Sequence, residues 1–179
     1  MDDFNTETNM YTTPIMYKNQ DSFKYLGNYS KYFYKVRNDT VLKELTFDLK
    51  EFQPNRDIIE DMNKREMLLK NYASIVDVQE SSDYLFLLVL FREKLRGIIL
   101  DKKTGGICNS SYINMPQRGG GIKNDYFPNS HFWPTYMDEK MMYSLLPIEE
   151  ALQVKEKLMF DGKKFQYDDN PIVLKVHLK

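Results

Sequence analysis

One stretch of the sequence gathers side chains that are well suited to recognising a ligand. Residues 124 to 147 read NDYFPNSHFWPTYMDEKMMYSLLP and bring His131, Trp133 and Tyr136 close together along the chain. Aromatic rings of this kind stack on carbohydrates and apolar ligands, and an imidazole can exchange protons or bind a metal. The functional interpretation therefore places these side chains at the mouth of a binding site. The predicted ligand-binding residues are His131, Trp133, Tyr136, Asp125 and Arg118.

The same stretch also has a purely structural interpretation. Phe132, Trp133 and Pro134 can form the hydrophobic start of a sheet, with Trp133 wedged between neighbouring sheets, because tryptophan is usually mostly buried. His131 then only caps the loop. The sequence alone leaves both interpretations open.

Metal and cofactor chemistry find little support in the residue spacing. The second histidine, His177, stands in the last predicted strand, and the sequence has no H-x-H or C-x-x-C motif. The run RGGG at 118 to 121 can cradle an anion through backbone N–H groups, but it matches neither the P-loop nor the dinucleotide fingerprint. We predict no metal and no cofactor, and we interpret this run as a flexible loop.

No catalytic residue is predicted. Cys108 follows Ile107 in a predicted strand, with no neighbour to activate its thiol, so we expect a packed or half-exposed strand residue. The paired carboxylates at 138–139, 149–150 and 168–169 are adjacent in sequence, whereas catalytic pairs usually come from separate elements. The sequence thus favours a protein that is not an enzyme.

Composition favours one folded, β-rich domain. The chain has 179 residues, of which 42% are hydrophobic and 28% charged, and its 13 Tyr and 11 Phe concentrate in short extended runs. The formal net charge of −1 predicts no attraction to nucleic acid. Segments 17–25 and 31–35 interleave Lys with aromatic residues; they could stack on single-stranded nucleic acid, but cross-strand aromatic pairing explains them more simply.

The sequence predicts no transmembrane segment. The longest apolar run, YLFLLVLF at 84–91, reaches about 26 Å as a strand but only about 12 Å as a helix. The start, MDDFNTETNMYTTP, is polar and acidic, without the apolar region of an export signal.

Alternation and turn residues predict the elements of the first half. Residues 1–10 read as a disordered tail, and 11–179 as a single β-rich domain. We expect a hairpin over 31–49 that turns at Asn38-Asp39. In its second strand Val41, Leu45, Phe47 and Leu49 should share one face. A helix is predicted over 57–70, starting with a capping box at Asp57 and Glu60.

The second half is predicted to hold a meander, a loop and two further β segments. The meander consists of runs at 74–81, 83–93, 95–103 and 106–114, with a tight turn at 101–106. Such a meander is the unit of a propeller blade or of a small sandwich. After it we expect a long loop (115–134), two short strands around Asp138-Glu139 (135–146), a helix (147–158) and a terminal strand (171–179).

The order of several motifs resembles a bacterial family of six-bladed β-propellers. These motifs are YKVRNDTV, SIVDVQESSDYLFL, GIILDKKTGG, a segment ND…FWPTY before a short helix, and a C-terminal DDNP followed by IVLKVHLK. The resemblance covers residues 11–179. It implies a partial propeller of about three antiparallel blades, at ~40–50 residues per blade, with two short helical insertions.

The family resemblance also implies a cellular role. Its members are about twice as long and start with an export signal, often of lipoprotein type, so we expect a truncated or split member placed in the periplasm or outer membrane. The implied function is non-catalytic: binding of an unknown ligand, such as a carbohydrate or peptide, or of a protein partner, as a scaffold of the cell envelope. Open sheet edges would then favour self-association.

Two alternatives to this function stay open. The first is a hydrolase or lyase whose active site lies in the propeller channel and is completed by a missing N-terminal half. The second is a truncation product that has no function of its own. Clustered carboxylates or histidines would favour the enzyme, and an exposed aromatic patch would favour binding.

Overall fold

The structure, a computed structural model, describes residues 14–19, 21–92, 94–113, 122–123, 131–138, 140–148, 151–152, 159–160, 163–164, 166 and 170–178. Over these residues the protein is mainly β, as its composition and alternation predict. The chain divides into two compact units, residues 1–78 with 87–95 and residues 79–86 with 96–179. A single domain over 11–179 stays a prediction.

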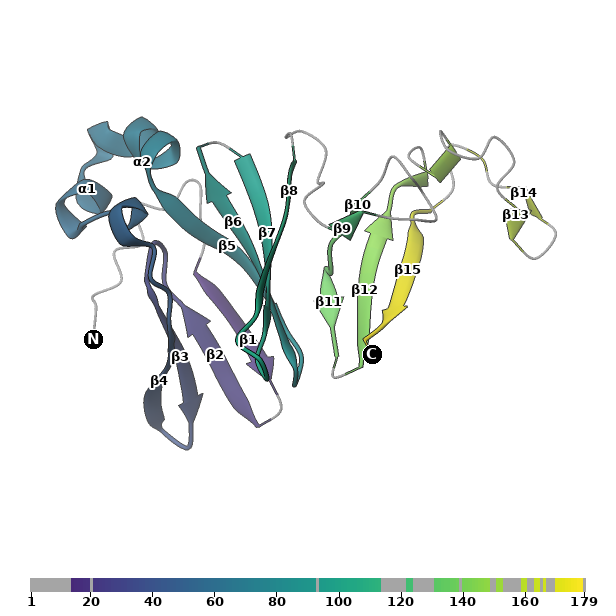
Figure 1. The fold of residues 1–179 in the computed structure, drawn as a ribbon, viewed down its shortest axis with the longest axis horizontal. Helices are drawn as coiled ribbons and strands as arrows, with labels where there is room; N and C mark the ends of the chain where they lie inside the picture. Colours follow the sequence, from purple (N-terminus) through teal and green to yellow (C-terminus); the bar gives the residue numbers. More distant parts are fainter. Residues whose placement is uncertain are drawn as a thin grey trace. The chain divides into compact units, whose positions relative to one another are not determined.

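The N-terminal sheet has four strands, and each pairs antiparallel with the next in the sequence (Figure 1). Tyr25 lies opposite Tyr34, and their ring centroids are 6.5 Å apart, which confirms cross-strand aromatic pairing in the Lys- and Tyr-rich segments. The strands are β1 (Ile15–Asn19), β2 (Ser22–Leu26), β3 (Tyr32–Arg37) and β4 (Thr40–Thr46).

The predicted hairpin turn at Asn38-Asp39 is confirmed. Both residues have positive φ, 46° and 60°, and link β3 to β4 as a two-residue turn. This geometry matches the right-handed twist of the flanking strands, and Asn and Asp tolerate it better than most residues.

The prediction that the apolar residues of β4 share one face is wrong. Phe33 pairs with Leu45 and Tyr34 with Lys43, so Glu44 is an extra residue between them, a β-bulge. The bulge changes the phase of the alternation. Val41 is therefore exposed, whereas Leu45, Phe47 and Leu49 are half-buried.

The predicted helix at 57–70 is present but interrupted. The predicted capping box at Asp57 and Glu60 is wrong, because the first helix begins at Arg56 and its N-cap is Asn55, whose side chain accepts a hydrogen bond from Ile58 N at 3.0 Å. The chain is extended at Asp61 and then resumes as helix. The insertion consists of the 3-10 turns η2 (Lys50–Phe52) and η3 (Met62–Lys64) and the helices α1 (Arg56–Glu60) and α2 (Arg65–Asn71).

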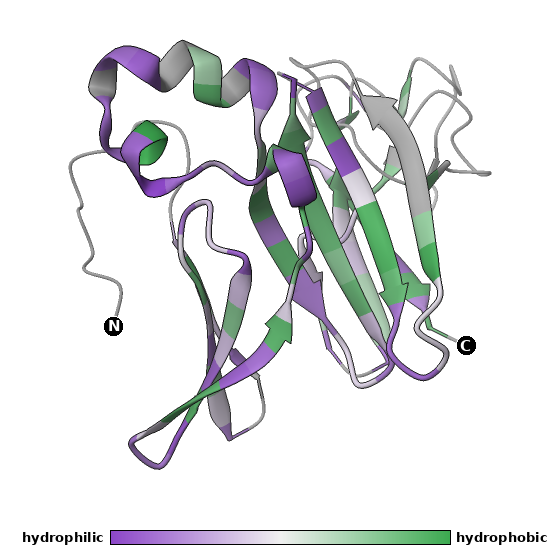
Figure 2. Ribbon diagram, turned by 60° about the vertical axis from the view of Figure 1, so that its left-hand side comes forward, coloured by the Kyte–Doolittle hydropathy of each residue, from purple (hydrophilic) through white to green (hydrophobic). Residues whose placement is uncertain are grey.

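The central sheet matches the predicted meander closely. Its order is β5-β6-β7-β8, and the eight-residue apolar run is the whole of β6. Leu85, Phe86 and Leu87 are consecutive and all buried, which confirms a strand covered on both faces; Figure 2 shows hydrophobic residues running along the strands of this sheet. The strands are β5 (Ala73–Glu80), β6 (Tyr84–Phe91), β7 (Lys94–Asp101) and β8 (Ile107–Ile113).

The turn between β7 and β8 has the predicted chemistry. The Asp101 side chain accepts hydrogen bonds from Lys103 N at 2.8 Å and Thr104 N at 3.1 Å. Gly105 has φ +71°, a conformation that glycine adopts without strain. These hydrogen bonds hold the pKa of Asp101 below its usual value, with the Thr104 backbone N–H as the largest cause.

The C-terminal three-stranded sheet has the order β11-β12-β15. The predicted turn at residue 138 is confirmed, since the Asp138 side chain accepts from Lys140 N and Met141 N at 3.0 and 2.8 Å. The predicted terminal strand is also confirmed and pairs antiparallel with β12. The strands are β11 (Tyr136–Met137), β12 (Met141–Leu146) and β15 (Ile172–His177).

Some predicted segments fall partly or wholly outside the described residues. The tail at 1–10 is outside them, as is most of the loop at 115–134, apart from the short pair β9 (Ile122–Lys123) and β10 (His131–Phe132). Of the helix at 147–158, helical residues are described at 148 and 151–152. A further pair joins β13 (Met159–Phe160) to β14 (Lys163–Lys164). No described helix is long and apolar enough to cross a membrane.

Candidate functional site

The exposed face of the C-terminal sheet brings together aromatic, aliphatic and basic side chains. The register places Tyr136 beside Tyr143 and Tyr143 beside Lys175, one residue on each of the three strands. Because side chains alternate between the faces of a strand, every second residue joins this surface. We call it the tyrosine face, and its residues are Tyr136, Met141, Tyr143, Leu145, Val173, Lys175 and His177.

The tyrosine face is open to solvent. Tyr136 is 61% exposed, Val173 61% and Leu145 54%. The Tyr136 and Tyr143 rings lie 5.7 Å apart at 41°, and Lys175 Nζ lies 5.7 Å from the Tyr143 ring centroid. Rings held apart at this spacing can each contact an apolar or sugar surface, while the ammonium adds a hydrogen-bond donor.

The opposite face of the same sheet anchors it. Met142, Ser144 and Leu146 alternate with the exposed residues and are buried. Leu146 and Ala151 form a core cluster against which the neighbouring strand β15 packs. The backbone N–H of Thr135 donates to the Tyr143 carbonyl at 2.8 Å, which fixes the chain just before Tyr136.

The burial of Trp133 agrees with the structural interpretation. Its side chain is buried, and its ring meets Phe86 at 5.7 Å in an edge-to-face contact. Phe132 and Pro134 on either side are buried as well. Within the part of the chain that the structure describes, Trp133 Nε1 has no hydrogen-bond partner.

The five predicted ligand-binding residues are therefore not seen as one group. Tyr136 lies on the tyrosine face and Trp133 in the core. His131 is placed in β10 by its backbone, while its side chain, Asp125 and Arg118 lie outside the described residues. A ligand-binding role for these residues stays a prediction.

Sequence reasoning missed Tyr143, Lys175 and Val173 as members of a surface. Their alternation along β12 and β15 was visible, but it did not reveal which strands are neighbours. The pairing of Tyr143 with Lys175 depends on a register between segments that are far apart in the chain.

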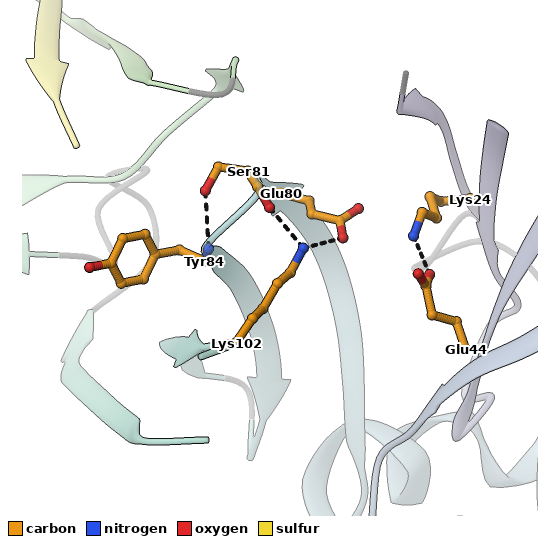
Figure 3. Close-up of polar contacts among 6 residues, drawn as sticks. All are labelled: Lys24, Glu44, Glu80, Ser81, Tyr84 and Lys102. Carbon is orange, nitrogen blue, oxygen red and sulfur yellow. Dashed lines mark hydrogen bonds and ion pairs between the residues drawn. The ribbon is translucent and has the colours of Figure 1, made fainter. Parts of the chain in front are cut away.

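Two lysines that are not part of the tyrosine face form ion pairs (Figure 3). Lys24, on the covered side of the N-terminal sheet, donates to Glu44 of the β4 bulge. Lys102 donates to Glu80 and, at 2.7 Å, to the Ser81 carbonyl. In both cases the ammonium is engaged by a carboxylate, so we assign these lysines a structural role.

Other reactive groups are scattered. Cys108 is exposed on β8, so the expectation of a packed or half-exposed thiol is wrong. Burial raises the pKa of the Tyr29 hydroxyl. Among the described residues, no group of three or more His, Cys, Asp or Glu side chains lies close enough to hold a metal ion.

The fold is similar to that of a solved protein from Bacteroides fragilis, described as a "Putative exported protein". The two structures superpose with a TM-score of 0.61 at 15% sequence identity, over 92% of this chain and 49% of the other. The chain thus spans about half the length of the protein that it matches, and the likeness is one of fold. No protein-family model and no curated protein matches the chain.

Proposed function

We propose that the chain is a non-catalytic binding or scaffold protein of the bacterial cell envelope, and that its antiparallel sheets are blades of a six-bladed β-propeller. The observation that carries the binding role is the exposed tyrosine face. Solvent-exposed rings and aliphatic side chains, gathered on a sheet whose other side is buried, are typical of a recognition surface.

The arrangement of strands supports the propeller part of the proposal. In both four-stranded sheets the strands follow one another in sequence order, which is the order within a propeller blade. The solved protein of similar fold is about twice as long as the matching region. On this proposal that protein would contain a second set of blades beyond the region that this chain matches.

The cellular location rests on the description of that same protein as a "Putative exported protein". For this chain an envelope location agrees with the sequence resemblance to envelope propellers. Its test is fractionation of the native bacterium with an antibody against the chain. Recovery in the periplasmic or membrane fraction supports the proposal, and recovery only with cytosolic markers contradicts it.

A matched pair of variants at one position tests the binding surface. The purified chain is screened against arrays of oligosaccharides and peptides, and any ligand found is titrated against Tyr136→Ala and Tyr136→Phe. Stacking depends on the ring and not on the hydroxyl. We therefore expect Tyr136→Ala to weaken binding about tenfold and Tyr136→Phe to keep it, and equal binding by all three proteins would rule out this face.

A further inference from the structure

We propose that the exposed face of the N-terminal sheet is a second docking surface and that it binds an acidic segment of another protein. The register places Met16, Tyr25, Tyr34 and Lys43 side by side on the four strands, and Lys18, Phe23, Val36 and Val41 in the next row. We call this surface the lysine–tyrosine face. Its residues are these eight together with Tyr32.

Apolar side chains on this face are open to solvent although the sheet has a buried side. Met16 is 70% exposed, Val41 57% and Phe23 51%. On the opposite side, Lys24, Leu26 and Phe33 are buried. A contiguous apolar surface of this kind on a folded protein marks a place of interaction.

The tyrosines on this face form a row with defined spacing. Tyr25 and Tyr34 lie 6.5 Å apart at 29°, and Tyr32 and Tyr34 lie 6.2 Å apart. Tyrosine is enriched at the energetic centres of protein interfaces, because it combines a large apolar ring with a polar hydroxyl. The row therefore offers anchor positions for a protein partner.

The charges on the face identify the chemistry of that partner. The face contains Lys18 and Lys43 and has no carboxylate among its residues, and Lys43 Nζ lies 3.7 Å from the Tyr32 ring centroid. Glu44, the carboxylate nearest in sequence, instead pairs with Lys24 on the buried side. An acidic surface is complementary to this face.

The same charges exclude the two other obvious occupants. A second copy of the chain docked by the same face would bring lysines against lysines, an arrangement that like-charge repulsion disfavours. Single-stranded nucleic acid would use the tyrosines, but its affinity grows with the number of phosphates that are neutralised, and this face offers only Lys18 and Lys43 among its residues. Exposed Met16, Phe23 and Val41 also fit the apolar core of a protein interface better than a phosphate backbone.

The size of the face favours a short segment as the occupant. Four strands about 4.8 Å apart, each contributing a few residues at about 3.4 Å, make a surface roughly 15 Å by 17 Å. The area of such a surface is well below the ~800 Å² that each partner contributes to a standard interface. An extended or helical acidic segment fits such a surface, whereas a whole domain would overlap its borders.

The inference does not depend on the proposed ligand site. The lysine–tyrosine face belongs to residues 1–78, and the tyrosine face to residues 96–179, in different compact units. One face could therefore bind its target while the other does not, and each has its own variants.

The test uses a fluorescein-labelled random copolymer of glutamate and tyrosine as the probe, in fluorescence anisotropy titrations with the full chain. We expect the native chain to bind this copolymer and Lys18→Glu/Lys43→Glu to bind it at least tenfold more weakly. Lys140→Glu, an exposed lysine of the other unit, is the matched control and should change binding by less than twofold. Thermal unfolding verifies that each variant is folded.

A charge-swapped probe keeps the test decisive. A copolymer of lysine and tyrosine should bind Lys18→Glu/Lys43→Glu more tightly than it binds the native chain. The proposal is overturned if the acidic copolymer does not bind, if Lys140→Glu weakens binding as much as the double variant, or if oligo-dT binds more tightly than the copolymer.

Discussion

The ammonium of Lys24 is almost fully buried, and its carboxylate partner Glu44 is about a third exposed. The Lys24 ammonium also lies 5.8 Å from the Phe33 ring centroid. Glu44→Gln removes the compensating charge while keeping the shape of the side chain. We expect it to lower the free energy of unfolding by about 2 kcal/mol, somewhat less than for a fully buried pair.

Two control variants, measured by urea denaturation, show whether this loss of unfolding free energy comes from the buried charge. Glu60→Gln breaks the exposed Arg56–Glu60 pair and should cost less than about 0.5 kcal/mol. Lys24→Met combined with Glu44→Gln removes both charges and should recover most of the loss, because an apolar side chain then fills the buried position. Equal losses for Glu44→Gln and Glu60→Gln would show that Lys24 does not depend on this carboxylate.

The pH dependence of stability should show the contribution of Asp101. Hydrogen bonds from Thr104 and Lys103 lower its pKa in the folded protein below the ordinary 3.8. The ionised Asp101 carboxylate therefore stabilises the fold fully above about pH 4. This contribution is lost as the pH falls through the lowered pKa that Asp101 has in the folded protein. The difference in unfolding free energy between the native chain and Asp101→Asn should be constant near neutral pH and shrink below about pH 4. A difference that is constant down to about pH 2 would contradict the prediction.

At the scale of elements, the turn between β3 and β4 has a distinctive requirement. Asp39 has φ +60°, a left-handed conformation that glycine adopts freely and β-branched residues resist. Asp39→Val should lower the free energy of unfolding by about 1–2 kcal/mol, and Asp39→Gly should leave it equal or higher. Thermal unfolding compares the two. If both destabilise alike, the Asp39 side chain, and not its backbone conformation, stabilises the turn.

Local patterns predicted the strands well, because each depends on a few adjacent residues. The run at 84–91 and the Asp101 turn needed only hydrophobicity and turn chemistry to be recognised. The interruption at Asp61 was not predicted, because the apolar spacing continues through it; its carboxylate accepts hydrogen bonds from Lys64 and from Asn63 N, which lower its pKa.

The candidate surfaces could be predicted only in part. Tyr136 was identified from its aromatic neighbours in the sequence, yet it is the register with Tyr143 and Lys175 that makes a surface. The lysine–tyrosine face was visible as two basic and aromatic segments. What the sequence lacked was the bulge at Glu44, which puts Val41 on the exposed face and brings the Glu44 carboxylate to the buried Lys24.

For the whole molecule, the propeller proposal predicts that the sheets end in unsatisfied edges. The edge strands of the two larger sheets are β1, β4, β5 and β8, and those of the C-terminal sheet are β11 and β15. Unpaired strand edges invite association. Light scattering with small-angle X-ray scattering should therefore show a mass that rises above 21.4 kDa with concentration.

A proline in an edge strand provides the control for this measurement. Val173→Pro places proline at an exposed position of β15 and should reduce association if that edge takes part. A compact particle of 21.4 kDa at every concentration would contradict the half-propeller proposal. In that case the tyrosine face would be the first surface to examine in the isolated chain.

The bulge at Glu44 also has a consequence for how the sheet can change in evolution. At this point β4 has one residue more than the strand it pairs with. A relative in which β3 and β4 pair without a bulge would have one residue fewer here, so its sequence alignment with this chain would need a one-residue gap. An alignment that placed this gap even two positions away would match exposed residues with buried ones. Loss of Glu44 by deletion would leave the Lys24 ammonium buried without its carboxylate. We therefore expect the deletion to occur together with an uncharged residue in place of Lys24, so that the two positions covary.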